Sequence, residues 1–298
     1  MHKSLYMVQD HPEKEKVKGT QDMAKKKETV APSVDESVEI FDHFIENFDH
    51  LQSGDGLGGF ESLNAEVIAY PFIRVLQQLS PQLNKKKQAY VEGAQEGMLY
   101  NNVSDKCYEV PVEVVVGRFD RYFIEWQPER GGFAGAHMPE AINAMIQRSE
   151  LKRDERNRLY SPETKNTFAD TYVYYILFPD FLEDGVCLLS LSSTQLKEAK
   201  RWNRLLLTTF IPGTNRRAQP YFMRWTITTP EMSNDKGDWC GFRVDFAGFV
   251  GPETLQIVSD ERKALPSDTM PNLKAIEGSI EEIQEDAIEG EYIAVDKF

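Results

Sequence analysis

The sequence predicts a β-rich α+β domain between two disordered segments. Apolar residues alternate with polar ones from residue 108 onward, further apolar strand patterns follow, and one amphipathic helix pattern stands between them. With 298 residues, 41% of them hydrophobic, the chain is long enough for one large domain or two small ones. We place a disordered N-terminal segment at 1–37, the β-rich domain at 38–265 and an acidic disordered tail at 266–298.

Two segments precede the first alternating pattern. Residues 1–37 are polar and charged with almost no apolar pattern, which is typical of disorder. From Val38 to Leu51 apolar residues recur at helical spacing, which predicts an amphipathic helix. The apolar residues Ile68, Phe72, Val75 and Leu76 predict a buried strand or a short helix, whose length Pro71 and Pro81 limit.

The first β pattern is YEVPVEVVVG at 108–117, in which valine occupies every second position. The run FDRYFIEW at 119–126 follows Gly117 and Arg118, so we expect it to be the second strand of a hairpin. Residues 128–143 are glycine-rich at their start and we expect them to form a loop. Their glycine spacing matches neither a dinucleotide-binding fingerprint nor a phosphate loop.

The second half of the domain combines strands and helices. DTYVYYILF and GVCLLSLS predict two strands, and Ser192 to Thr194 offer an N-cap for a helix from about Gln195 to Phe210. AQPYFMRWTITT and DWCGFRVDFAG predict two more strands, and a short helix is expected from Glu253 to Ala264. About six strands with an inserted helix favour a barrel or a sandwich, so we expect an OB-like small β-barrel with inserted helices.

One segment concentrates positive charge and aromatic rings. Residues 196–225 contain seven basic residues and one acidic residue, a net charge of +6 in a chain of net charge −14. Cations that follow phosphates and rings that stack on bases are what single-stranded nucleic acid requires. The candidate nucleic-acid-binding residues are Lys197, Lys200, Arg201, Trp202, Arg204, Arg216, Arg217, Tyr221, Arg224 and Trp225, joined by Arg118 and Arg121 from the 118–126 region.

The alternative for the same residues is structural. Aromatic residues at strand spacing belong more often to a core than to a stacking surface. Tyr221, Met223 and Trp225 share one face of their predicted strand, whereas Phe222 and Arg224 share the other, so only one set can point outward.

Negative charge is concentrated at the C-terminus. Residues 277–298 contain eight acidic residues and one lysine, a net charge of −7 that is half of the chain total. Acidic blocks of this kind act as interaction tails. Asp296 and Phe298 are the candidate partner-binding residues, because a terminal aromatic ring with its carboxylate fits a basic, apolar pocket. The alternative is a tail that only aids solubility.

Other classes of function find little support in the sequence. Cys107, Cys187 and Cys240 are odd in number and widely spaced, which favours a reducing compartment over a disulfide framework or a zinc site. The five histidines are scattered, and no nucleophile, base or two-metal arrangement stands out. We therefore expect no enzyme, no cofactor, no metal site and no membrane span, and a cytoplasmic location, in the host cytoplasm if the chain is phage-encoded.

The acidic tail that closes on Asp296, Lys297 and Phe298 resembles the tails of single-stranded DNA-binding proteins of bacteria and their phages. Lys297 departs from that pattern. Two stretches, FIEWQPERGGFAGAH and SLSSTQLKEAKRWN, look similar to phage early-region proteins thought to bind DNA. The resemblance implies an OB-fold core and a tail that recruits replication or recombination proteins through Phe298.

The expected function is therefore sequence-tolerant binding of single-stranded DNA in phage replication or recombination, with a tail that competes with DNA and a possible homo-oligomer. The first alternative is a phage structural or assembly protein whose β core associates with itself. A nuclease is the second alternative.

Overall fold

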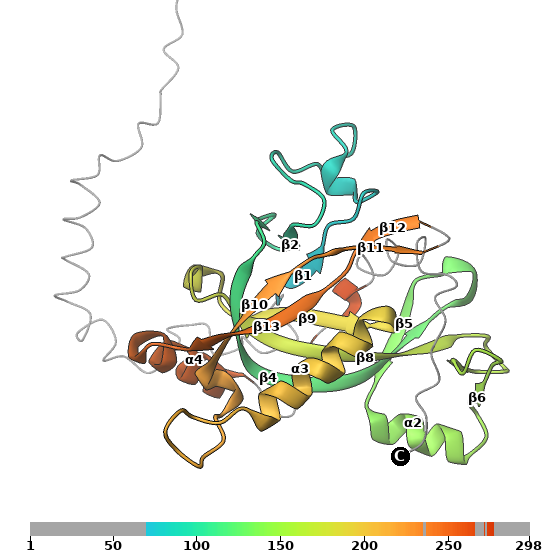
Figure 1. The fold of residues 1–298 in the computed structure, drawn as a ribbon. Helices are drawn as coiled ribbons and strands as arrows, with labels where there is room; N and C mark the ends of the chain where they lie inside the picture. Colours follow the sequence, from blue (N-terminus) through green and yellow to red (C-terminus); the bar gives the residue numbers. More distant parts are fainter. Residues whose placement is uncertain (1–69, 235–236, 266–270, 272, 277–298) are drawn as a thin grey trace, which may run out of the picture. The chain divides into compact units, whose positions relative to one another are not determined.

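Eleven strands form one curved sheet and two more form a separate hairpin in the part of the chain that the structure describes (Figure 1). The computed structural model describes residues 70–234, 237–265, 271 and 273–276. The predicted disorder at 1–37, the predicted helix at 38–51 and residues 277–298 of the predicted tail lie outside these residues. Within the disordered tail predicted at 266–298, Leu273–Ile276 instead form a short 3-10 helix, and Leu273 is buried.

The strands are β1 (Phe72–Val75), β2 (Leu99–Asn101), β3 (Cys107–Tyr108), β4 (Val112–Trp126), β5 (Phe133–His137), β6 (Lys152–Arg153), β7 (Leu159–Tyr160), β8 (Thr167–Leu177), β9 (Cys187–Ser192), β10 (Met223–Thr228), β11 (Glu231–Asn234), β12 (Gly237–Cys240) and β13 (Arg243–Phe249). The α-helices are α2 (Pro139–Gln147), α3 (Leu196–Thr208) and α4 (Pro252–Ala264). Short 3-10 helices are η1 (Pro81–Leu83), η2 (Pro128–Arg130), η3 (Leu182–Asp184), η4 (Ser193–Gln195), η5 (Pro220–Phe222) and η6 (Leu273–Ile276).

The main path through the sheet runs in the order β13–β10–β4–β8–β9–β1–β2–β3. Neighbouring strands on this path are antiparallel, except β1 and β9, which are parallel. β5 also pairs with β4, and β7 joins β6 to β8. The predicted β-rich α+β class is confirmed. The OB-like barrel is not confirmed, because the path has two ends, at β13 and at β3, and the barrel stays a prediction.

The long strand β4 corrects one prediction. It continues for 15 residues and pairs with β8 along most of its length. The predicted hairpin turn at Gly117 and Arg118 is wrong: the register with β8 shifts there by one residue, which is a β-bulge. Because the extra residue reverses the alternation of side chains, Val114 before the bulge and Ile124 after it lie in different cores.

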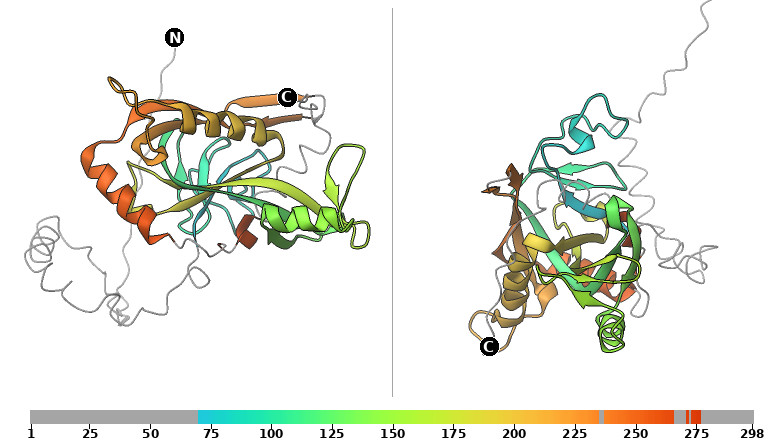
Figure 2. Two further views of the ribbon diagram at one scale, coloured as in Figure 1. Left: turned by 90° about the horizontal axis from the view of Figure 1, so that it is seen from below. Right: turned by 90° about the vertical axis from the view of Figure 1, so that its right-hand side faces the viewer.

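The inner face of the sheet curls around the larger core. This core takes residues from both ends of the strand path, including Val244 of β13 and Tyr108 of β3. Helix α3 covers the face (Figure 2) and inserts Trp202, whose ring stacks on Tyr174 with a centroid distance of 4.3 Å. Trp225 of β10 meets Trp202 edge to face at 6.1 Å. These rings hold the helix against the sheet.

The opposite, outer face carries a second core, the outer core, whereas the larger core on the inner face is the inner core. Tyr175 of β8 and Leu188 of β9 pack there with Val258 of α4 and Leu273 of η6. A third, smaller cluster lies where β4 and β8 extend past these layers, and Ile142 of α2 packs into it. The sheet is thus covered by α3 on one face and by α4 and η6 on the other.

Several predicted elements are confirmed and two are wrong. The two apolar runs at 170–192 form most of the antiparallel pair β8 and β9, and the two predicted helices that lie within the described residues are present as α3 and α4. The predicted loop at 128–143 contains β5 and the start of α2; Pro139 suits the first turn of a helix, where its missing N–H has no partner to lose. The predicted strand at 238–248 is divided between β12 and β13.

We predict that Trp202→Ala lowers the free energy of unfolding by about 3–5 kcal/mol, because it removes a fully buried ring. Leu207→Ala on the same helix is the matched control; its side chain is 63% exposed, and its removal should cost less than about 0.5 kcal/mol. Urea unfolding followed by circular dichroism measures both. Equal losses would contradict the burial of Trp202.

Candidate nucleic-acid interface

Helix α3 presents a cationic outer face. Ala199, Trp202 and Leu206 form its buried side, as the helical spacing of apolar residues requires. Lys197, Lys200 and Arg204 are exposed, and their spacing of three and four residues places them along one side of the helix. No ion pair joins these three cations to another residue in the described part of the chain. Their charges therefore face solvent.

The loop after α3 extends this positive charge. Phe210 and Arg217 form a β-bridge, and the chain turns between them with Gly213 at a φ of 72°. Phe210 is 51% exposed, and the Arg217 guanidinium lies 5.9 Å from the centre of its ring. Arg216 is also exposed. This loop follows the C-terminal end of α3 (Figure 1) and adds two exposed cations and one accessible ring.

Three predicted stacking residues are wholly or partly buried. Trp202 and Trp225 are 0% exposed, so the prediction that they stack on bases is wrong: the inner core needs both indoles. Tyr221 is half-buried, with the Arg262 guanidinium 4.7 Å from its ring centre and Phe222 at its edge. Its ring packs in the core beneath α4, away from the inner core that α3 covers.

Four predicted phosphate contacts are arginines already paired with acids. The pairs are Arg118 with Asp120, Arg121 with Asp170, Arg201 with Glu198, and Arg224 with Glu113, at N–O distances from 2.5 to 2.9 Å. The first two of these arginines both belong to the strand β4.

Arg118 stacks over Tyr175 in the outer core, and Arg121 stacks over Tyr172 in the inner core. The two arginines lie on opposite faces of the sheet, so the prediction that both extend one cationic track is wrong.

The pair between Glu198 and Arg201 attaches α3 to the open edge of β13. The Val244 N–H donates to Glu198 Oε1 at 2.8 Å, and Arg201 donates to the Val244 carbonyl. Burial raises the pKa of Glu198, but the hydrogen bonds from Arg201 and from the Val244 N–H outweigh it, so the pKa lies below its usual value. This contact orients the outer face of α3.

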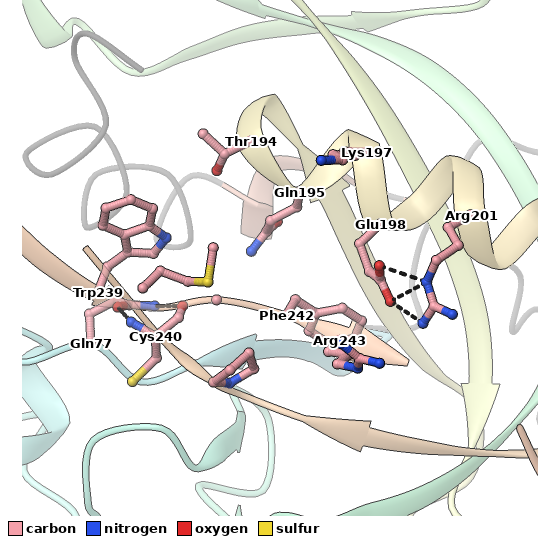
Figure 3. A pocket seen from close by; sticks show the side chains of 13 residues that line it. Gln77, Thr194, Gln195, Lys197, Glu198, Arg201, Trp239, Cys240, Phe242 and Arg243 are labelled. Carbon is pink, nitrogen blue, oxygen red and sulfur yellow. Dashed lines mark hydrogen bonds and ion pairs between the residues drawn. The ribbon is translucent and has the colours of Figure 1, made fainter. Parts of the chain in front are cut away.

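A cavity of about 550 Å³ lies between the start of α3 and the β11–β12 hairpin (Figure 3). Trp239 and Met232 line it from one face of the hairpin, where they are cross-strand neighbours. Gln195 and Lys197 line it from the helix side. The hairpin is fixed beside the cavity by Gln77, whose amide exchanges two hydrogen bonds of 2.8 and 3.0 Å with the Cys240 backbone.

The residues of this hairpin were not predicted from the sequence as part of a site. A usable pattern was present: in 238–248 the apolar residues Cys240, Phe242 and Val244 define the buried side, and Trp239 falls on the other side. A large ring on the polar side of a strand indicates a surface role. The predicted partner-binding residues Asp296 and Phe298 lie outside the described residues.

Other reactive groups offer little chemistry. Burial raises the pKa of Cys187 to about 12 and that of Cys240 to about 11, so both thiols are protonated at neutral pH. Within the described residues, no three His, Cys, Asp or Glu side chains group closely enough to hold a metal ion. None of the described helices combines the length and the apolar character needed to cross a membrane.

We predict that Glu198→Gln destabilises the fold at neutral pH but not in acid. The folded-state pKa is lowered, so the stabilisation exists above the unfolded-state pKa, about 4.3, and is lost as the pH falls through the folded-state value. Urea unfolding at pH 7 should show a loss of about 1–2 kcal/mol. Glu163→Gln, at an exposed position, is the control. If the difference in unfolding free energy between Glu198→Gln and the wild type persists unchanged below pH 4, the lowered pKa of Glu198 is contradicted.

Comparison with known proteins adds a family. No curated protein and no solved structure matches the chain significantly. The model of the Pam3 phage gp34-like protein family matches residues 42–266, which include α3, the loop after it and the β11–β12 hairpin. That match covers most of the chain, and the chain belongs to the Pam3 phage gp34-like protein family.

Proposed function

We propose that this phage-family protein binds single-stranded DNA without strong sequence preference, in phage DNA replication or recombination. The observation that carries the proposal is the set of exposed cations on α3 and on the loop after it, which have no ion-pair partner among the described residues. The loop also carries the exposed ring of Phe210. The set consists of Lys197, Lys200, Arg204, Arg216 and Arg217.

The positive charge of this surface and the ring of Phe210 both suit a single strand. Each cation that neutralises a phosphate of a single strand releases condensed counterions and contributes about −0.7 to the slope of log K against log salt. Five such contacts would give a slope no steeper than about −3.5. Phe210 adds a flat apolar surface, on which an unpaired base can stack and a base inside a duplex cannot. The combination favours a single strand over a duplex.

The acidic tail is the second part of the proposal. Residues 277–298 carry a net charge of −7 and are long enough to act as a competing polyanion. DNA, with its higher charge density, displaces the tail, and the released Asp296 and Phe298 bind replication or recombination proteins.

The alternative function, self-association through the β core in a phage structure, is disfavoured at one sheet edge. An exposed edge strand pairs readily with a second chain. At β13 the Val244 N–H and carbonyl are already bonded to Glu198 and Arg201 of α3. Static light scattering separates the two functions, because an assembly protein forms large oligomers without DNA.

We predict that replacing Lys197, Lys200 and Arg204 together by alanine weakens binding of fluorescent oligo-dT and reduces the salt slope by about 2. The control replaces Lys85, Lys86 and Lys87 by alanine. These exposed lysines lie on the connection between β1 and β2 and give the same change in net charge. Fluorescence anisotropy at several salt concentrations measures both variants. Equal losses in the two variants would show that only net charge matters and would refute the α3 surface.

We predict that deleting residues 277–298 tightens binding of oligo-dT several-fold at low salt, because the competing acids are removed. Replacing Phe298 alone by alanine keeps all the charges of the tail and should leave DNA affinity unchanged. The same anisotropy titration measures both. If the deletion leaves affinity unchanged, the tail does not compete with DNA.

A further inference from the structure

The cavity beside α3 has one accessible aromatic wall. The chain contains four tryptophans, and Trp126, Trp202 and Trp225 are at most 6% exposed. Trp239 is the remaining one; it is partly exposed and lines the cavity together with Met232, which is 46% exposed. An accessible indole beside a flexible thioether forms a flat apolar surface that a planar ring can occupy.

The opposite wall supplies polar groups and one charge. Arg201 and Arg243 also line the cavity, but both are paired with acids, Arg201 with Glu198 and Arg243 with Asp245. Lys197 lines the same cavity, is exposed, and has no ion-pair partner in the described part of the chain. The side chain of Gln195 reaches toward the hairpin from the helix side (Figure 3). An amide of this kind can both donate to and accept from a base edge.

We infer that this cavity holds one unstacked base of the bound strand, with Trp239 as its stacking surface and Lys197 on the adjoining phosphate. The inference rests on the proposed function and adds to it a site for a nucleotide at the N-terminal end of the cationic face of α3. A volume of about 550 Å³ lies within the range of ligand sites and accommodates a nucleotide.

The wall chemistry favours a nucleotide over simpler occupants. A phosphate alone would leave Trp239 and Met232 without a partner. A purely apolar side chain would face Lys197 and Gln195 without satisfying them. A base with its phosphate matches both walls, and its position continues the line of Lys200 and Arg204 along α3.

The test uses the full-length protein, oligo-dT, an abasic oligonucleotide of equal length, and thymidine 5′-monophosphate. Oligo-dT should quench the accessible tryptophan emission of the wild type, and the abasic strand should not. Trp239→Phe should lose the quenching while keeping most of the affinity, because phenylalanine still stacks. Trp239→Ala should weaken oligo-dT binding by about five- to 100-fold and leave the abasic strand unaffected. Ser233→Ala is the control and should bind like the wild type. Ser233 follows Met232 on β11 of the same hairpin and pairs across the strands with Asp238.

The outcomes separate this inference from the proposed function. If oligo-dT and the abasic strand bind equally well, with a salt slope that depends on Lys200 and Arg204, the strand is bound by its backbone and the base site is refuted while the function stands. If neither strand binds at low salt, both are refuted. If thymidine 5′-monophosphate quenches Trp239 at micromolar concentration while oligo-dT does not, the cavity takes a free nucleotide and the strand is not its occupant.

Discussion

The pairing of β4 with β8, interrupted once at Gly117, is the constraint on which the rest of the structure depends. A regular strand offers one set of alternate side chains to each face along its whole length. The bulge shifts that alternation, so the even-numbered residues of one half of β4 serve the inner core and those of the other half serve the outer core. Both faces of the sheet thereby become apolar enough to be covered, by α3 on one side and by α4 with η6 on the other. Trp202 can then stack on Tyr174, which fixes the depth of α3.

The candidate site follows from how α3 is held. Trp202 anchors its inner side and the contact of Glu198 and Arg201 with Val244 anchors its flank, so Lys200 and Arg204 are left on the solvent side. The positive charge of residues 196–225 is thereby divided into two kinds. Arg201, beside β13, and Arg224, on β10, pair with carboxylates and support the fold, whereas the cations on the outer helix face and the following loop find no carboxylate among the described residues. A local excess of charge in a sequence thus overstates the charge that a surface can offer to a ligand.

The sequence predicted the elements better than it predicted their faces. The β-rich class, the pair β8 and β9, and the helices α3 and α4 were predictable because each has a clear period of apolar residues. The bulge in β4 was not, because Gly117 in a valine-rich run has the pattern of a turn as much as that of a bulge. Within the site, Lys197, Lys200 and Arg204 were predictable from helical spacing. Trp202 and Trp225 were misassigned because composition cannot show which side of an element meets the sheet, and Trp239 was missed because its hairpin was merged into a longer strand.

The acidic net charge of −14 does not oppose a nucleic-acid ligand uniformly. At about 0.1 M ionic strength the Debye length is about 10 Å, so a strand lying on α3 senses the cations of that face more strongly than acids elsewhere on the chain. Attraction is therefore short in range and depends on contact rather than on steering from a distance. As salt is diluted, the acids act over longer distances and oppose the approach of a second polyanion. The gain in affinity at low salt should then be smaller than a count of five phosphate contacts implies, and removal of the acidic tail should restore much of the difference.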